Sequence, residues 1–214
     1  MASLKRGHSF SGEGRGFCTR CIRAQKTCYC SDIVPVRTQI EFVILQHPLE
    51  HRNSIGTARM TYHSIENSKL LVGTHFDDNA AVTRLIGNED NHCVVLYPGA
   101  FAQNLSLLSS DEIRCAFPEQ KTLVIFVIDG TWPCAKKMLR NSLNLSSLPQ
   151  ICFTPKTESG YRIRLQPNKH CLSTIEAVHH LIGILDPKVD SSNLLKVFHR
   201  MIERQIQYTK EALV

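Results

Sequence analysis

Short apolar runs alternate with longer amphipathic segments along most of this chain. Three of the runs, Ile40–Leu45, Cys93–Leu96 and Leu123–Ile128, are almost continuously apolar, which is typical of strands buried on both faces of a parallel sheet. Two shorter runs, Leu70–Val72 and Ile151–Phe153, have the same character. The pattern therefore predicts five strands in a mostly parallel sheet.

The segments between and after these runs repeat their apolar residues with the spacing of an α-helix. The expected helices are Thr57–Glu66, Asp78–Ile86, Ser110–Phe117, a helix starting near Pro133, Thr174–Leu185 and Ser191–Lys210. Alternating strands and helices indicate an α/β fold whose sheet carries helices on both faces. The chain contains no internal repeat.

Composition and charge narrow the class of protein. Of the 214 residues, 43% are hydrophobic and 21% are charged, which is ordinary for a globular protein with a substantial core. The formal net charge of +6 favours an anionic partner such as RNA, although solubility alone is a sufficient reason for this charge. We expect a tail at 1–17, a small module at 18–36 and a main domain at 37–214.

The sequence predicts neither a membrane span nor a secretory signal. No stretch reaches about 18 apolar residues, the length of a membrane helix. Residues 1–17 are rich in Gly, Ser and Arg and have no apolar core, unlike a signal peptide. We therefore expect a disordered tail, no membrane association and a cytoplasmic location. An organelle transit peptide is the alternative for this acid-poor segment.

Four cysteines lie close together near the start of the chain, as Cys18-x2-Cys21-x6-Cys28-x-Cys30. Four thiolates can surround one zinc ion tetrahedrally, and a filled four-thiolate shell leaves no position for a catalytic water. The other five of the nine cysteines are scattered over the rest of the chain, so composition does not explain the cluster. The spacing predicts a structural zinc site, with a redox pair or four unrelated cysteines as the alternatives.

A candidate site follows the longest apolar run. Asp129 comes directly after Leu123–Ile128, and Gly130, Thr131 and Trp132 precede an expected helix. Ligands of open α/β sheets bind beyond the carboxyl ends of strands, so Asp129 and Thr131 are expected to face a ligand. Trp132 is suited to stack on a flat ring. A capping aspartate and a core tryptophan are the alternative, and the chain has no G-x-x-x-x-G-K-[ST] motif of an NTPase.

Two further motifs carry candidate anion-binding groups. Ser173 and Glu176 have the spacing of a helix capping box, and the N-terminus of a helix attracts anions. The alternation in Tyr161–Leu165 predicts a short strand with Arg162 and Arg164 on one face. Guanidinium groups so placed bind carboxylate or phosphate, so we expect Arg162 and Arg164 to contact RNA. An exposed basic strand edge is the alternative.

RNA contacts are expected in two more places. His47 and Arg52 follow the first expected strand in a polar loop, although an isolated histidine is more often structural. Lys196, Arg200 and Arg204 are each four residues apart and therefore share one face of the last expected helix. This basic face is expected to lie along an RNA backbone, with an ordinary solvated helix surface as the alternative.

Taken together, these motifs resemble the DTW-domain family, the tRNA-uridine aminocarboxypropyltransferases. Each piece is weak alone, but the set occurs in the family's order between residues 18 and 185. The pieces are the cysteine cluster, His47-Pro48-x-Glu50, Leu96-Tyr97-Pro98-Gly99, Asp129-Gly130-Thr131-Trp132, Tyr161-Arg162-Ile163-Arg164 and Ser173-Thr174-Ile175-Glu176-Ala177. One departure is Gly56, where the family often has an asparagine before the residue that matches Thr57.

The resemblance implies a SPOUT-like knotted fold with a pocket for S-adenosylmethionine. The residues that it assigns to this pocket are Tyr97, Pro98, Gly99, Gly130, Thr131, Trp132, Leu172, Ser173, Thr174 and Glu176. It also implies transfer of the 3-amino-3-carboxypropyl group to N3 of a tRNA uridine, with release of methylthioadenosine. We expect Asp129 to act as the general base that takes the N3 proton. The rival interpretations are a SPOUT methyltransferase and a non-enzymatic zinc-containing RNA-binding module.

Overall fold

The computed structural model describes residues 16–155, 157–164 and 171–211. Its centre is a six-stranded sheet in which every pairing is parallel, with the order β2-β1-β5-β3-β6-β4. The strands are β1 (Glu41–Gln46), β2 (Ser68–Val72), β3 (Asn91–Leu96), β4 (Gln103–Asn104), β5 (Thr122–Asp129) and β6 (Gln150–Cys152). Strand β5 pairs with β1 on one side and with β3 on the other. Its carboxyl end is therefore flanked by the carboxyl ends of two neighbouring strands.

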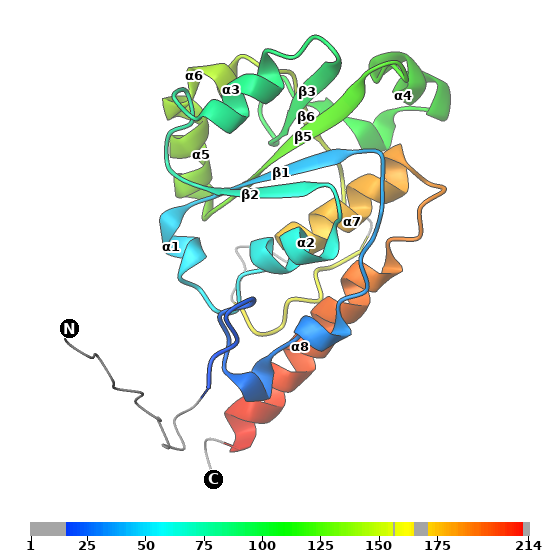
Figure 1. The fold of residues 1–214 in the computed structure, drawn as a ribbon. Helices are drawn as coiled ribbons and strands as arrows, with labels where there is room; N and C mark the ends of the chain where they lie inside the picture. The colour runs from blue at the N-terminus through cyan, green and yellow to red at the C-terminus, as the bar shows by residue number, and fades with distance from the viewer. Residues whose placement is uncertain (1–15, 156, 165–170, 212–214) are drawn as a thin grey trace, which may run out of the picture.

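Helices cover both faces of this sheet (Figure 1). They are α1 (Pro48–His51), α2 (Ala58–Ser64), α3 (Ala80–Ile86), α4 (Ser110–Ala116), α5 (Trp132–Asn141), α6 (Leu143–Ser146), α7 (Thr174–Leu185) and α8 (Ser192–Glu211). Short 3-10 helices are η1 (Gln25–Thr27), η2 (Cys30–Asp32) and η3 (Leu105–Leu107). Helices α2, α7 and α8 pack on one face, whereas α3, α5 and α6 pack on the other.

The pleat of the central strands divides the core into two apolar layers. In β5, Ile125 and Val127 face the layer that contains α7 and α8, and Val124 and Phe126 face the layer that contains α3 and α5. All four side chains are buried. Each such side chain stabilises the fold by about 1.5–3 kcal/mol, and this explains why the strand is apolar throughout instead of alternating.

The expected α/β class is confirmed, with a parallel sheet and helices on both faces. The five expected strands and six expected helices are present, with ends displaced by no more than two residues. Strand β4 and helices α1 and α6 were not expected, because each has only two to four residues and is too short to show a period.

The strand expected at Tyr161–Leu165 is wrong. Residues 162–164 form a turn, in which the backbone N–H of Arg162 donates to the carbonyl of Gly160 at 2.8 Å. Tyr161 is buried and donates its hydroxyl proton to the carbonyl of Ile55, while Arg164 turns inward and Arg162 is exposed. These tertiary contacts override the local alternation, and Leu165 lies outside the described residues.

The cysteine-containing segment lies along α8 (Figure 1). Cys21 and Tyr29 are buried in the same apolar cluster as residues of α7 and α8, and Val36 forms a parallel bridge with Ile65. The segment therefore shares its core with the main body. Among the described helices, none has the length and apolar character needed to cross a bilayer.

Candidate functional site

A cavity of about 770 Å³ opens beyond the carboxyl ends of β3, β5 and β6. Parallel sheets place their ligand sites at this edge. The expected site residues that line the cavity are Tyr97, Pro98, Asp129, Gly130, Thr131, Trp132, Arg164, Leu172, Ser173 and Thr174. The structure thus brings together three loops that are far apart in the sequence.

Two residues expected in the pocket, Gly99 and Glu176, support its walls instead of lining it. A side chain at position 99 would overlap the side chain of Gln150, so glycine lets the loop after β3 lie against β6. The carboxylate of Glu176 accepts hydrogen bonds from Ser173 N–H at 2.8 Å and from Gly160 N–H at 2.7 Å. Glu176 therefore fastens the loop at Gly160 to the beginning of α7.

Asp129 holds three elements together at the cavity. One carboxylate oxygen accepts from the Thr174 hydroxyl at 2.6 Å, and the other accepts from the Gln46 side-chain amide at 3.0 Å. Burial raises the pKa of Asp129, and these two hydrogen bonds act in the opposite direction. Because both donors are uncharged, the carboxyl can gain or lose a proton without breaking an ion pair with them.

The contacts of Asp129 continue through Gln46 to a histidine that the sequence analysis did not single out. Gln46 is 1% exposed, and its Oε1 lies 3.0 Å from Nδ1 of His51. Since the Gln46 amide donates to Asp129, its Oε1 is placed to accept from Nδ1–H of His51. Nη2 of Arg59 lies beside the same ring, 3.1 Å from Nδ1 and 3.3 Å from Nε2. Burial and the nearby Arg59 lower the pKa of His51, which favours the neutral ring.

Glu50 and Arg164 form a second polar pair beside Asp129. Arg164 donates to both Glu50 oxygens, with Nη1–Oε2 at 3.0 Å and Nη2–Oε1 at 2.5 Å. This bidentate pair raises the pKa of Arg164, and Glu50 is buried. The guanidinium that was expected to contact RNA is therefore already engaged by a carboxylate of the protein.

Thr57 and Tyr161 also line the cavity, although the sequence analysis assigned neither to it. The Thr57 hydroxyl oxygen accepts from the backbone N–H of Thr174 at 3.1 Å. Burial raises the pKa of Tyr161 to about 12, so its hydroxyl stays protonated and donates to the carbonyl of Ile55. Tyr161 belonged to a matched motif and Thr57 followed the departure at Gly56, but only tertiary structure places them on the cavity wall.

Two expected RNA contacts, His47 and Arg52, differ in their surroundings. His47 caps α1 by accepting from Leu49 N–H at 3.2 Å, and its backbone N–H donates to the carbonyl of Asp129 at 2.8 Å. Arg52 is exposed at the end of α1. His47 thus has a structural position near the cavity, whereas Arg52 faces solvent.

Two of the three expected basic residues of α8, Arg200 and Arg204, lie against the cysteine segment. Arg200 and Arg204 approach Oδ1 of Asp32 at 3.2 and 3.1 Å, and Lys196 donates to Asn193 at 3.1 Å. Asp32 belongs to η2, so its carboxylate joins that short helix to α8. Part of the basic face is therefore neutralised within the protein.

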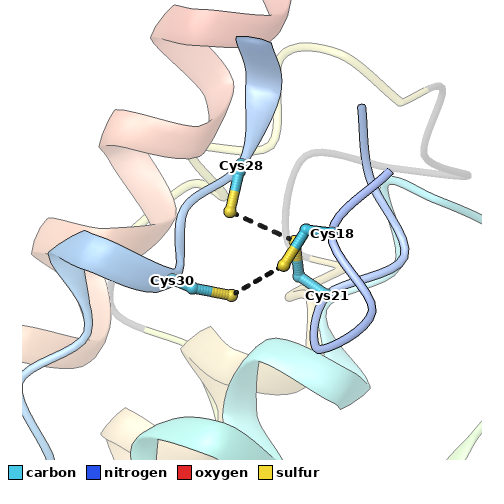
Figure 2. Close-up of side chains that lie close together, drawn as sticks. All are labelled: Cys18, Cys21, Cys28 and Cys30. Atoms are coloured by element: carbon cyan, nitrogen blue, oxygen red, sulfur yellow. Dashed lines mark hydrogen bonds between the residues drawn. The ribbon is translucent and has the colours of Figure 1, made fainter. Parts of the chain in front are cut away.

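The four clustered cysteines point toward one another (Figure 2). All four sulfur atoms lie within 4.8 Å of one another, with Cys18–Cys30 at 3.7 Å and Cys21–Cys28 at 3.6 Å. A tetrahedral site with zinc–sulfur bonds of about 2.3 Å has sulfur–sulfur edges of about 3.8 Å. Both the donor atoms and their spacing therefore fit zinc, and within the described part of the chain no other group of three or more candidate ligands is found.

Comparison with known proteins supplies an independent classification. The DTW domain family matches residues 15–206. The chain is 30% identical to "tRNA-uridine aminocarboxypropyltransferase 2" of Mus musculus over 92% of its length, and 30% identical to the protein of the same name in Drosophila melanogaster over 90%. It spans 65% of the mouse protein and 76% of the fly protein.

A plant relative carries a similar name. The chain is 26% identical to "tRNA-uridine aminocarboxypropyltransferase A" of Arabidopsis thaliana, over 92% of this chain and 83% of that protein. No solved structure matches the chain.

Proposed function

This chain belongs to the DTW-domain family, and we propose that it transfers the 3-amino-3-carboxypropyl group of S-adenosylmethionine to N3 of a uridine in tRNA. The observation that carries the proposal is the convergence of three motif-bearing loops and Asp129 on one cavity. Its volume of about 770 Å³ lies within the range of small-molecule sites, roughly 300–1,000 Å³. The names of the relatives support the reaction type.

The donor is assigned to the loops after β3 and β5 and to the start of α7. Trp132 lines the cavity and is 48% exposed, so its ring is available to stack on the adenine. The N-terminus of α7, a helix of 12 residues, directs its positive end toward the cavity and suits the carboxylate of the donor. Tyr97 and Leu172 contribute further wall surface.

Asp129 is assigned as the base that accepts the uridine N3 proton. Each of its oxygens accepts one described hydrogen bond. A second lone pair on each oxygen therefore remains to accept the N3 proton of the uridine. As the N3–carbon bond forms, the bond from sulfur to the first methylene of the arm breaks, and its electron pair neutralises the sulfonium. Methylthioadenosine leaves, and the N3 proton ends on Asp129. The raised pKa of Asp129 strengthens it as a base.

We assign a structural zinc ion to Cys18, Cys21, Cys28 and Cys30. The sulfur positions fit a four-thiolate shell, and such a shell has no open position for substrate or water. When bound, the metal supplies local folding energy, not reaction chemistry.

The finer fold and location assignments are part of the same proposal. A SPOUT-like knot is part of the proposal because the family resemblance implies it; α7 lies against the end of β5, where Thr174 donates to Asp129 at 2.6 Å. A cytoplasmic location is supported by the nine cysteines, none of which forms a disulfide in the described part of the chain, as is usual in a reducing compartment.

Nucleoside mass spectrometry tests the reaction. Unmodified tRNA is incubated with the protein and S-adenosylmethionine, digested, and compared with a sample lacking the donor. We expect a uridine that carries the aminocarboxypropyl group, together with methylthioadenosine. A nucleoside that carries only an added methyl group would identify a methyltransferase instead. Retention of tRNA with no donor-dependent change in mass would identify a binding module.

A further inference from the structure

Arg23 is a buried arginine in the middle of the cysteine segment. It is 2% exposed. Its guanidinium donates to the carbonyls of Thr27 and Ser54, each at 2.9 Å, and to Oε1 of Gln205 at 2.6 Å. All of its described hydrogen bonds therefore end on uncharged oxygens. Because a guanidinium stays protonated, its buried charge is unfavourable unless negative charge lies nearby.

The cysteine site can supply that negative charge. Arg23 lies in the sequence between Cys21 and Cys28, and its carbonyl accepts from the backbone N–H of Cys18 at 2.8 Å. Four thiolates around one divalent zinc ion leave the site with a net negative charge. The guanidinium and a filled metal site thus carry charges of opposite sign and are adjacent in the chain.

The other side of Arg23 contacts the loop at 53–57, which borders the cavity. Ser54 accepts from Arg23, and the next residue, Ile55, accepts from the hydroxyl of Tyr161. At the end of the loop, Thr57 accepts from Thr174 N–H at 3.1 Å. Thr57, Tyr161 and Thr174 all line the cavity, so one short loop connects Arg23 with three of its wall residues.

We propose that Arg23 is a positioning residue that couples metal binding at the four cysteines to the order of the cavity wall through loop 53–57. Its positive charge stabilises the zinc-bound thiolates. Its hydrogen bonds to Thr27, Ser54 and Gln205 hold the loop against α8. The inference rests on the proposed zinc site, but it is independent of the reaction that the cavity carries out.

Two measurements test this coupling without tRNA or donor. The first is zinc affinity by competition with a chromophoric chelator. The second is amide hydrogen exchange of peptides that cover 53–57 and 171–175. In the unaltered protein, we expect removal of zinc to accelerate exchange in both peptides by roughly tenfold or more. Unchanged exchange after zinc removal, or a purified chain that binds no zinc, would overturn the proposal.

Variants of Arg23 separate its charge from its hydrogen bonds. Arg23→Gln should weaken zinc binding by about 10–100-fold, the usual effect of removing a partner outside the ligand shell, and should free the loop. Arg23→Lys keeps the positive charge but cannot make all three hydrogen bonds of the guanidinium. It should therefore still bind zinc, while the backbone amides of loop 53–57 exchange faster than in the unaltered protein. If neither variant folds, the change in amide exchange of the unaltered protein on removal of zinc still tests the proposal.

Arg20→Gln is the matched control, because Arg20 is an exposed cation in the same segment. We expect it to leave both zinc affinity and loop exchange unchanged. Equal losses of zinc affinity in Arg20→Gln and Arg23→Gln would show that net charge alone matters. That result would remove the special role of the buried guanidinium.

Discussion

Asp129 at the end of β5 and Arg23 in the cysteine segment are both charged groups that the fold encloses. Asp129 receives its described hydrogen bonds from Gln46 and Thr174, and Arg23 gives its own to two carbonyls and the Gln205 amide. All of these partners are uncharged. The two regions thus hold opposite charges with uncharged hydrogen-bond partners, although Asp129 lines the cavity and Arg23 is only 2% exposed.

The two groups differ in whether they can become neutral. Burial raises the pKa of Asp129, so the carboxyl can become neutral by taking a proton. A guanidinium has no such route at ordinary pH and depends on a counter-charge. The end of β5 is therefore suited to proton transfer, whereas the cysteine segment is suited to permanent structure around a metal site.

The strongest test of the adjustable charge is Asp129→Asn. The amide cannot accept the N3 proton, and a positioned general base is worth about 10²–10⁴-fold in rate. We expect single-turnover transfer to fall by that factor. The folded structure should remain, because the oxygen of the new side-chain amide still accepts from Thr174 and only the hydrogen bond from Gln46 is lost. The control is Asp78→Asn, whose side chain is 97% exposed. A near-normal rate for Asp129→Asn would show that Asp129 is not the base.

The corresponding test in the cysteine segment removes the metal site that is proposed to balance the charge of Arg23. Cys28→Ser deletes one of the four sulfur ligands, so we expect purified protein to lose most of its one zinc ion per chain. Structural zinc sites are worth about 10–16 kcal/mol in isolated zinc-finger peptides. This segment also shares the apolar core, so a smaller loss of stability, on the order of 3 kcal/mol, is expected. Elemental analysis and thermal unfolding measure the two effects.

The control for Cys28→Ser is Cys115→Ser, because Cys115 is an exposed free thiol. It should change neither metal content nor melting temperature. Equal metal content in both variants would contradict the four-cysteine site.

The pH dependence sharpens the comparison. Between the ordinary aspartate pKa of 3.8 and the raised pKa of Asp129, the folded state binds more protons at this residue than the unfolded state does. The free energy of unfolding should therefore fall as pH rises through this window, by at most about 1.4 kcal/mol per pH unit. Chemical denaturation of the parent protein and Asp129→Asn at several pH values measures the difference.

Asp129→Asn should lack this contribution, so its stability relative to the parent should increase as pH rises through the window. The transfer rate of the parent should fall as pH decreases through the raised pKa, because the base becomes protonated. A stability difference between the two proteins that does not vary with pH would contradict the raised pKa.

The sequence predicted local features of both regions, but it did not predict the long-range side-chain contacts that these residues make. The cysteine spacing alone identified a candidate metal site, and the apolar run before Asp129 placed that residue at the edge of a sheet. The pairs Glu50–Arg164 and Arg23–Gln205 join positions more than 100 residues apart. No periodicity encodes such contacts, and the alternation around Arg164 even indicated the wrong element.

The smallest expected effect concerns the exposed cations of α8. The triple change of Lys196, Arg200 and Arg204 to Gln removes three positive charges from one helix face, but Asp32 already pairs with two of them. Each phosphate that a cation neutralises on a duplex contributes about 0.9 to the salt slope, so full engagement would lower the slope of tRNA binding by roughly 2–3 units. Because Asp32 competes with phosphate, we expect a fall of about 1–2 units, measured as affinity against salt concentration.

The matched variant changes Lys136, Lys137 and Arg140 to Gln. These three cations of α5 are exposed and take part in none of the ion pairs described for this chain. Both triple variants remove the same net charge, so the difference between their salt slopes isolates the position of the charge. An equal or larger fall in the α5 variant would assign the effect to overall charge, and α8 would then keep only its structural contact with the cysteine segment.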